Sequence, residues 1–101
     1  MIRLTPHAQK RAGECAMALR PVMGEQGRHV VRRLLAAAPP KGEVAVYIEV
    51  PPGIQDPFRH QWHEPTHLVA VARNGRVEGV FFSRKNQLNK KHLRVKEVRR
   101  A

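Results

Sequence analysis

The sequence is poor in several features on which common protein classes depend. Cys15 is its only cysteine among 101 residues, so no intramolecular disulfide can form. Only five residues are aromatic, one Trp, one Tyr and three Phe, and we therefore expect a thin core. No apolar run is long enough to span a bilayer, and no basic amphipathic stretch carries the large aromatic anchors of an interfacial helix. We therefore expect no membrane partner.

Several catalytic signatures are also missing. The sequence contains no Gly-rich phosphate loop, no Ser-His-Asp set and no paired-carboxylate motif, so nucleotide hydrolysis and glycosidase chemistry have no support and no cofactor is expected. Met1 leads into Ile2-Arg3-Leu4 without the apolar run of a signal peptide. Together with the single cysteine, this predicts a reducing, cytoplasmic location.

Acidic residues are scarce relative to basic ones. Eight Asp and Glu stand against 19 Lys and Arg, which gives a formal net charge of +11 at pH 7. So large a surplus destabilises a compact state by self-repulsion, and it is most easily understood as the footprint of a polyanionic partner. RNA is the partner that we expect first.

The N-terminal third has the pattern of two helices. Thr5-Pro6 is a strong start signal, because the Thr hydroxyl can cap free backbone N–H groups and Pro fits the first turn. Pro21 limits how far this first helix can continue. Gly24 and Gly27 are expected to break the chain before a second helix, which Pro39-Pro40 then ends. The apolar positions of the first helix are Ala8, Ala12, Cys15, Ala16 and Leu19.

From Glu43 the period of the apolar residues changes to two. Residues 43–50 alternate as in a strand with one buried face. Residues 66–73 and 76–83 are two further apolar runs, and Asn74-Gly75 between them suits a type I′ turn, which predicts a β-hairpin. We therefore expect an α+β fold, with two N-terminal helices packed on one face of a three- to four-stranded antiparallel sheet.

The chain is short enough for one domain, which we place over residues 1–83. Residues 84–101 hold eight Lys or Arg and one acid, Glu97. This basic segment belongs to the same domain or forms a partly ordered tail that orders on a polyanion. Leu93, Val95 and Val98 within it suit a short final strand or a turn of helix.

His7 and Arg11 are four residues apart and so lie on the same face of the first helix. An imidazole can transfer a proton near neutral pH, and a guanidinium can hold a phosphate with two hydrogen bonds. This pair would therefore suit metal-free RNA cleavage, which needs a base, a cation and an acid. The same spacing also suits the solvated side of an amphipathic helix.

Two segments resemble those of RelE-type toxins, within the wider RelE, barnase, EndoU and colicin-type group of small endoribonucleases. The opening Ile2-Arg3-Leu4-Thr5-Pro6-His7-Ala8-Gln9-Lys10-Arg11 resembles their short extended segment and a helix with a His-Ala-x-x-Arg signature, and Val80-Phe81-Phe82-Ser83 resembles their last strands. The resemblance implies a metal-independent endoribonuclease. Its catalytic and substrate-flanking residues would be His7, Arg11, Ser83, Arg84 and Gln87.

Residues 54–65 are expected to form a loop, with a short edge strand allowed around Gln61 and Trp62. Three histidines lie close together in this part of the sequence, namely His60, His63 and His67. Neutral imidazoles bind zinc and Glu64 could be a fourth ligand, but Pro65 forbids a regular helix and no cysteine is near. We therefore predict no metal site. One of these histidines is a candidate second acid/base beside His7, and all three also suit a loop that faces nucleic acid.

Basic and aromatic side chains could bind nucleic acid without reading its sequence. Trp62 and Tyr47 could stack on unpaired bases or pack as core or rim residues. The candidates for contacts with the phosphate backbone are Arg28, Arg32, Arg33, Arg84, Lys85, Lys90 and Lys91.

Three functions stay open at this stage. The first is a small endoribonuclease of toxin–antitoxin type, with an acidic antitoxin as a second partner and with dependence on the ribosome undecided. The second is a non-catalytic nucleic-acid-binding module or a phage or bacterial regulator. The third is an interaction protein whose basic face binds an acidic protein.

Overall fold

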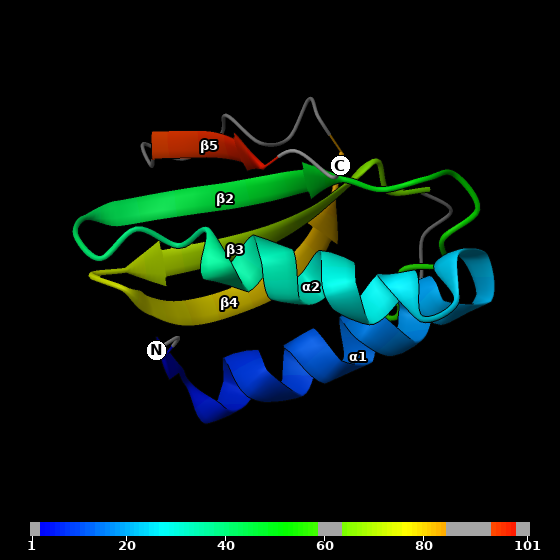
Figure 1. Cartoon of the computed structure of the whole chain (residues 1–101), viewed down its shortest axis with the longest axis horizontal. Coiled ribbons are helices and arrows are strands. Elements are labelled where there is room, and N and C mark those ends of the chain that lie inside the picture. Colours follow the sequence, from blue (N-terminus) through cyan, green and yellow to red (C-terminus); the bar gives the residue numbers. More distant parts are fainter. Residues whose placement is uncertain (1–2, 59–63, 85–93, 99–101) are drawn as a thin grey trace.

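The computed structural model describes residues 3–58, 64–84 and 94–98 and shows an α+β fold. Helices α1 (Pro6–Met23) and α2 (Gln26–Ala36) lie on one side of a five-stranded sheet (Figure 1). This confirms the predicted fold class and the N-terminal position of the helices. The strands are β1 (Arg3–Leu4), β2 (Glu43–Glu49), β3 (His67–Arg73), β4 (Arg76–Ser83) and β5 (Arg94–Val98).

The sheet is mixed, whereas we expected it to be antiparallel with at most four strands. Its order is β1-β4-β3-β2-β5. The three central strands are antiparallel as predicted, but β1 is parallel to β4 and β5 is parallel to β2. The sequence analysis leaves β5 open between a short strand and a turn of helix, and it gives β1 only as the extended segment that the resemblance implies. Two residues in β1 and five in β5 are too few for a clear alternation of apolar side chains.

Helix α1 begins where the sequence predicts. The Thr5 hydroxyl accepts a hydrogen bond from the Ala8 N–H at 3.1 Å, and Pro6 fills the first turn. The Thr5 N–H also donates to the Val77 carbonyl at 3.0 Å, which ties the start of α1 to the start of β4. Pro21 lies inside the helix and does not end it, because α1 continues to Met23.

Gly24 and Gly27 have different roles, although both were expected to break the chain. Gly24 has a φ of +60° and ends α1, and its N–H donates to the Arg20 carbonyl at 2.8 Å. Gly27 lies buried inside α2, where a Cβ would stand 2.8 Å from the Cβ of Leu19. Its missing side chain therefore allows the two helices to pack closely.

The predicted hairpin and strand β2 are confirmed. Asn74 and Gly75 have φ values of +51° and +80° between β3 and β4, as a type I′ turn requires. The Asn74 N–H donates to the Gly42 carbonyl, and the Gly42 N–H donates to Asn74 Oδ1, both at 2.9 Å. The hairpin is thereby joined to the segment that leads into β2.

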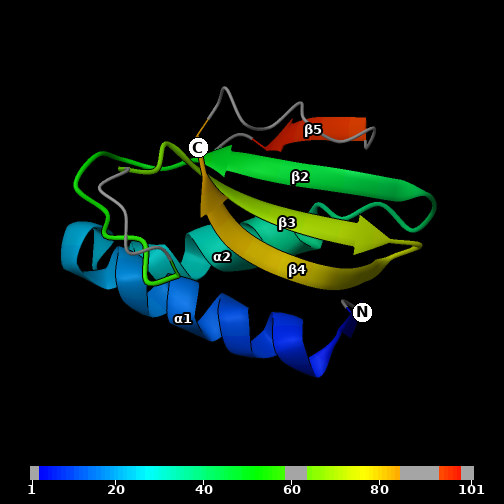
Figure 2. The same ribbon diagram turned by 180° about the vertical axis from the view of Figure 1, so that it is seen from behind.

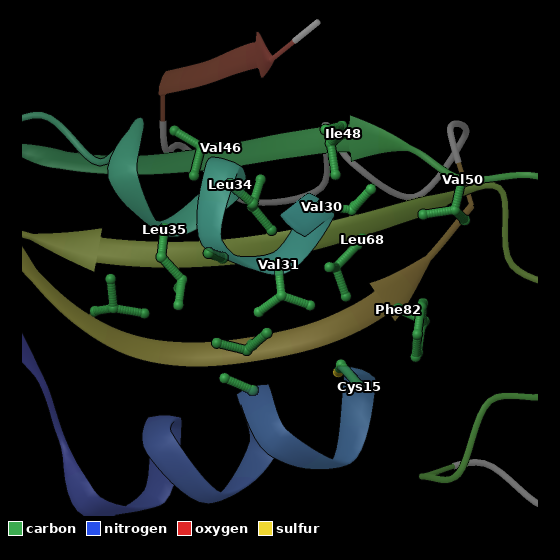
Figure 3. Packing of buried hydrophobic residues seen from close by; sticks show 14 of the residues in the cluster. Cys15, Val30, Val31, Leu34, Leu35, Val46, Ile48, Val50, Leu68 and Phe82 are labelled. Carbon is green, nitrogen blue, oxygen red and sulfur yellow. The ribbon is translucent and has the colours of Figure 1, made fainter. Parts of the chain in front are cut away.

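The core lies between the helices and the sheet, and Figure 3 shows side chains from both layers converging there. Cys15 and Leu19 of α1 are fully buried in it. The other large, fully buried side chains of this core include Leu34, Ile48, Leu68 and Phe82.

The opposite side of the sheet has no helix over it among the described residues (Figure 2). Strand side chains alternate between the two sides, so the neighbours of the core residues Val46, Ile48, Leu68, Val80 and Phe82 point to this side. We call it the helix-free face. Its residues include Ala45, Tyr47, Glu49, His67, Val69, Val71, Gly79, Phe81 and Ser83.

Candidate nucleic-acid interface

His7 lies exposed in the first turn of α1. Within the described part of the chain, no hydrogen bond or ion pair joins its imidazole to another residue. The helix begins beside Val77, at the hairpin end of β4. His7 is therefore accessible, but none of the described residues orients its imidazole.

Arg11 lies one turn later and is already engaged. Its guanidinium stands over the ring of Phe58 at 4.2 Å from the centroid, and its Nη1 is 3.7 Å from the Glu14 carboxylate. The cation–π contact joins α1 to the loop that follows β2. In this conformation Arg11 stabilises the fold rather than forming a site with His7.

Cys15 lies one helical turn after Arg11 on α1, and its buried thiol is unreactive. Burial raises the pKa of its thiol to about 12, the carboxylates of Asp56 and Glu14 add to the rise, and Arg11 opposes it. A thiol with so high a pKa holds its proton at neutral pH and is a poor nucleophile. This agrees with the core position that the apolar stripe of the first helix predicts.

His67 and Ser83 face each other across β3 and β4 at the far end of the helix-free face. Both are buried, at 6% exposure each. The His67 Nδ1 shares a hydrogen bond of 2.8 Å with the Thr66 hydroxyl. The ring of Tyr47 meets the His67 ring edge to face, with centroids 5.2 Å apart. The imidazole is thus held from two sides.

The chain next to this pair is also held in place. The Ser83 hydroxyl donates to the Arg84 carbonyl at 3.3 Å, and the Arg84 Nε–H donates to the Glu64 carbonyl at 3.3 Å. The Gly53 N–H donates to the Glu64 carboxylate. These bonds bring the ends of the segment between β2 and β3 to the point where β4 ends.

The structure does not bring His7 and Arg11 together with Ser83. Helix α1 starts beside Val77, and Ser83 lies six residues farther along β4, about 20 Å at the rise of a strand. Phe82 points into the core beneath the helices, so Ser83 points to the opposite side of the sheet. His7 and Ser83 therefore belong to different faces as well as different ends of the sheet, and Arg11 lies on the helix side.

The predicted phosphate-binding arginines of the second helix are all exposed on α2. None of Arg28, Arg32 and Arg33 belongs to an ion pair between described residues, whereas Arg73 pairs with both Glu43 and Glu78 at 3.0 and 3.5 Å. The exposed side of α2 is consequently a basic surface, which we call the α2 arginine face and define by these three arginines.

Several predicted site residues lie outside the described residues, among them all but one of the clustered histidines. They are His60, Trp62, His63, Lys85, Gln87, Lys90 and Lys91. Within the described ranges, no group of three or more His, Cys, Asp or Glu could hold a metal ion.

The sequence analysis missed one arrangement on the helix-free face. Tyr47, Val69 and Phe81 form a row across β2, β3 and β4. The sequence analysis names Tyr47 together with Trp62 as candidates for base stacking, and it names Phe81 only as part of a strand. The alternation of Phe81 and Phe82 would have placed one ring on each side of the sheet, but the row also requires the register between strands, which the sequence pattern does not give.

Protein-family models, curated proteins and solved structures give no significant match to this chain. No helix among the described residues combines the length and the apolar character that crossing a membrane requires.

Proposed function

We propose that this protein binds RNA through its phosphates. The observation that carries the proposal is the α2 arginine face, in which like charges stand together without acidic neighbours in ion-pair distance among the described residues. Arg28 and Arg32 are four residues apart, a spacing at which like charges destabilise a helix. A polyanion whose phosphates bind both guanidinium groups removes this loss of helix stability.

The carboxylates of the protein do not neutralise this surface, because most of them are engaged elsewhere. Those with described partners are Glu14 with Arg11, Glu43 and Glu78 with Arg73, Asp56 with the Phe58 N–H, and Glu64 with the Gly53 N–H. The net charge of +11 therefore stays available to an external partner.

Arg28 adds a second argument. It lies in the first turn of α2, which contains no acidic residue, and Glu25 at the N-cap position makes no side-chain capping bond. The positive end of the helix dipole disfavours a cation there and favours an anion. A phosphate bound beside Arg28 would be favoured both by the guanidinium and by the positive end of the helix dipole.

The test is the binding of a fluorescently labelled single-stranded RNA, measured by anisotropy over a series of salt concentrations. The logarithm of the association constant should fall linearly with the logarithm of salt, and Arg32→Gln should make the slope shallower by about 0.7. Lys10→Gln, which removes one exposed charge from α1, is the matched control and should change the slope less. Binding that does not respond to salt would refute the proposal.

A second candidate function is metal-independent RNA cleavage. It is supported by the placement of His67 opposite Ser83, with Tyr47 and Arg84 beside them, and by the resemblance to RelE-type enzymes. In such a reaction a base removes the proton of a 2′-hydroxyl, the oxygen attacks the adjacent phosphate, and an acid protonates the departing 5′-oxygen. The products are a 2′,3′-cyclic phosphate and a 5′-hydroxyl.

Cleavage is tested with purified protein in excess EDTA and with a substrate that carries one 2′-deoxyribose. The 2′-deoxy substrate should bind without being cut. His67→Ala and His7→Ala then compare the two histidine positions, and a true acid or base should contribute about 10²–10⁴-fold to the rate and little to binding. If neither variant slows a measurable cleavage, neither histidine is the catalyst.

The toxin hypothesis is tested separately, by expressing the protein in cells. Expression should arrest growth, and an acidic antitoxin should relieve the arrest by covering the basic surfaces. Growth that is unaffected by expression, with RNA binding intact, would leave the non-catalytic RNA-binding module as the function.

A further inference from the structure

We propose that the helix-free face is a platform on which unpaired RNA bases stack, with Tyr47 and Phe81 as its two ring contacts. This inference rests on the proposed RNA binding and deepens it by naming single-stranded RNA as the ligand class. The platform is distinct from the α2 arginine face, because α2 packs against the other side of the sheet (Figures 1 and 2).

The register of the sheet places the two rings in one row. Tyr47 is paired with Val69 across β2 and β3, and Val69 is paired with Phe81 across β3 and β4. One strand separates the two aromatic residues, so their backbones are about 10 Å apart. At that spacing each ring can hold its own base.

The row is closely packed between its two rings, and its exposed apolar surface lies on Phe81. Val69 between the rings is only 2% exposed, whereas Phe81 is 36% exposed, an unusual loss of burial in a chain with three phenylalanines. Tyr47 is half-buried, and its ring packs against the His67 ring in an edge-to-face contact. Rigid rings bind a base with little loss of side-chain entropy.

The charges of the face suit a nucleic-acid strand. Across β2, β3 and β4 the middle of the face is uncharged, because the next row toward the hairpin consists of Ala45, Val71 and Gly79. Two acidic residues border this middle: Glu49 is in register with His67, and Glu97 of β5 is in register with Tyr47. Arginines lie beyond it at both ends, with Arg73 and Arg76 next to the hairpin and Arg84 after β4. Bases would occupy the uncharged middle, and phosphates would reach the ends.

Arg73 can take part although it already has partners. Its ion pairs with Glu43 and Glu78 join side chains that are 43–61% exposed. Exposed pairs of this kind contribute little free energy. A phosphate can therefore replace a carboxylate at Arg73 at low cost.

The experiment compares a single-stranded RNA with a duplex of the same length, using wild type and variants of Phe81. Phe81→Leu keeps an apolar side chain and removes the π face, and it should weaken binding of the single strand by about 5- to 150-fold with an unchanged salt slope. Duplex affinity should not change. Phe81→Tyr retains a ring and should bind as wild type does. Met17→Ala, at a 75% exposed position on α1, is the control for loss of a surface apolar group.

The possible results separate this inference from the proposed function. If wild type binds RNA in a salt-dependent way and Phe81→Leu binds the single strand equally well, the platform is refuted and RNA binding stands. If wild type binds no RNA, both fail. If wild type self-associates and Phe81→Leu is monomeric, the face is a protein interface and the platform is likewise refuted. Thermal unfolding of Phe81→Leu and Phe81→Tyr shows whether each variant is folded.

Discussion

Gly27 of α2 packs directly against Leu19 of α1, since a Cβ on Gly27 would stand 2.8 Å from the Leu19 Cβ. Leu19 is fully buried and cannot move aside without disturbing the core. We expect Gly27→Ala to lower the free energy of unfolding by about 1–3 kcal/mol through overpacking. Urea denaturation measures the change.

Gly13 provides the control for this substitution. It lies exposed within α1, and a Cβ there would meet nothing within 4 Å. Gly13→Ala should therefore raise the stability by about 0.5–1 kcal/mol, because alanine is the better helix former. Equal effects of the two substitutions would mean that helix packing does not depend on Gly27.

The hairpin turn yields a second prediction. Gly75 has a φ of +80°, and a Cβ there would stand 3.4 Å from the Pro40 Cα. Gly75→Val should cost about 1 kcal/mol or more, because a β-branched residue is strained at positive φ. Gly79→Ala, at a position of β4 where a Cβ would have open space, should cost less in the same thermal unfolding assay. The reverse order would contradict the assigned turn.

The cation–π contact between Arg11 and Phe58 can be measured by a double-mutant cycle. Arg11→Met and Phe58→Leu each remove the contact while keeping most of the apolar bulk. We expect a coupling of about 0.5–1 kcal/mol in the free energy of unfolding. The partly exposed ion pair of Arg11 with Glu14 should contribute less. A coupling of zero would show that the contact with Phe58 does not hold the Arg11 guanidinium, which could then bind a phosphate.

The thiol of Cys15 makes stability fall at high pH. Its pKa is about 12 in the folded protein against 9.0 for an ordinary thiol, so between these values the unfolded chain loses a proton that the folded chain keeps. The unfolded state is then favoured by about 1.4 kcal/mol per pH unit. Below pH 9 the group has no such effect. Urea denaturation at several alkaline pH values should show a smaller fall for Cys15→Ala than for wild type, and parallel curves would contradict the raised pKa.

The parts of the fold that the sequence predicted are those set by local chemistry. Thr5-Pro6 determines where α1 starts, Asn74-Gly75 determines the turn, and the alternation from Glu43 determines β2. Gly27 was misjudged because a glycine in a helix looks like a break until the neighbouring helix is known. The parallel edge strands depend on pairings between distant segments, for which the local pattern carries no signal.

The candidate site also has features that local sequence predicts and features that depend on distant contacts. The spacing of His7 and Arg11 correctly places them one turn apart, but the partner of Arg11 is Phe58, 47 residues away, and no periodicity reveals it. His67 could be singled out as a histidine near others, whereas its position opposite Ser83 and beside Tyr47 follows from strand register alone. The row of Tyr47, Val69 and Phe81 could not be predicted for the same reason.

The central claim is that RNA is bound through the α2 arginine face, and its most direct test is the salt dependence of RNA binding by a protein with Arg28, Arg32 and Arg33 all changed to Gln. Each lost phosphate contact with a single strand should make the log–log slope shallower by about 0.7, so three contacts predict a change of about two. Circular dichroism establishes that the variant is folded. An unchanged slope in the folded variant would contradict the account.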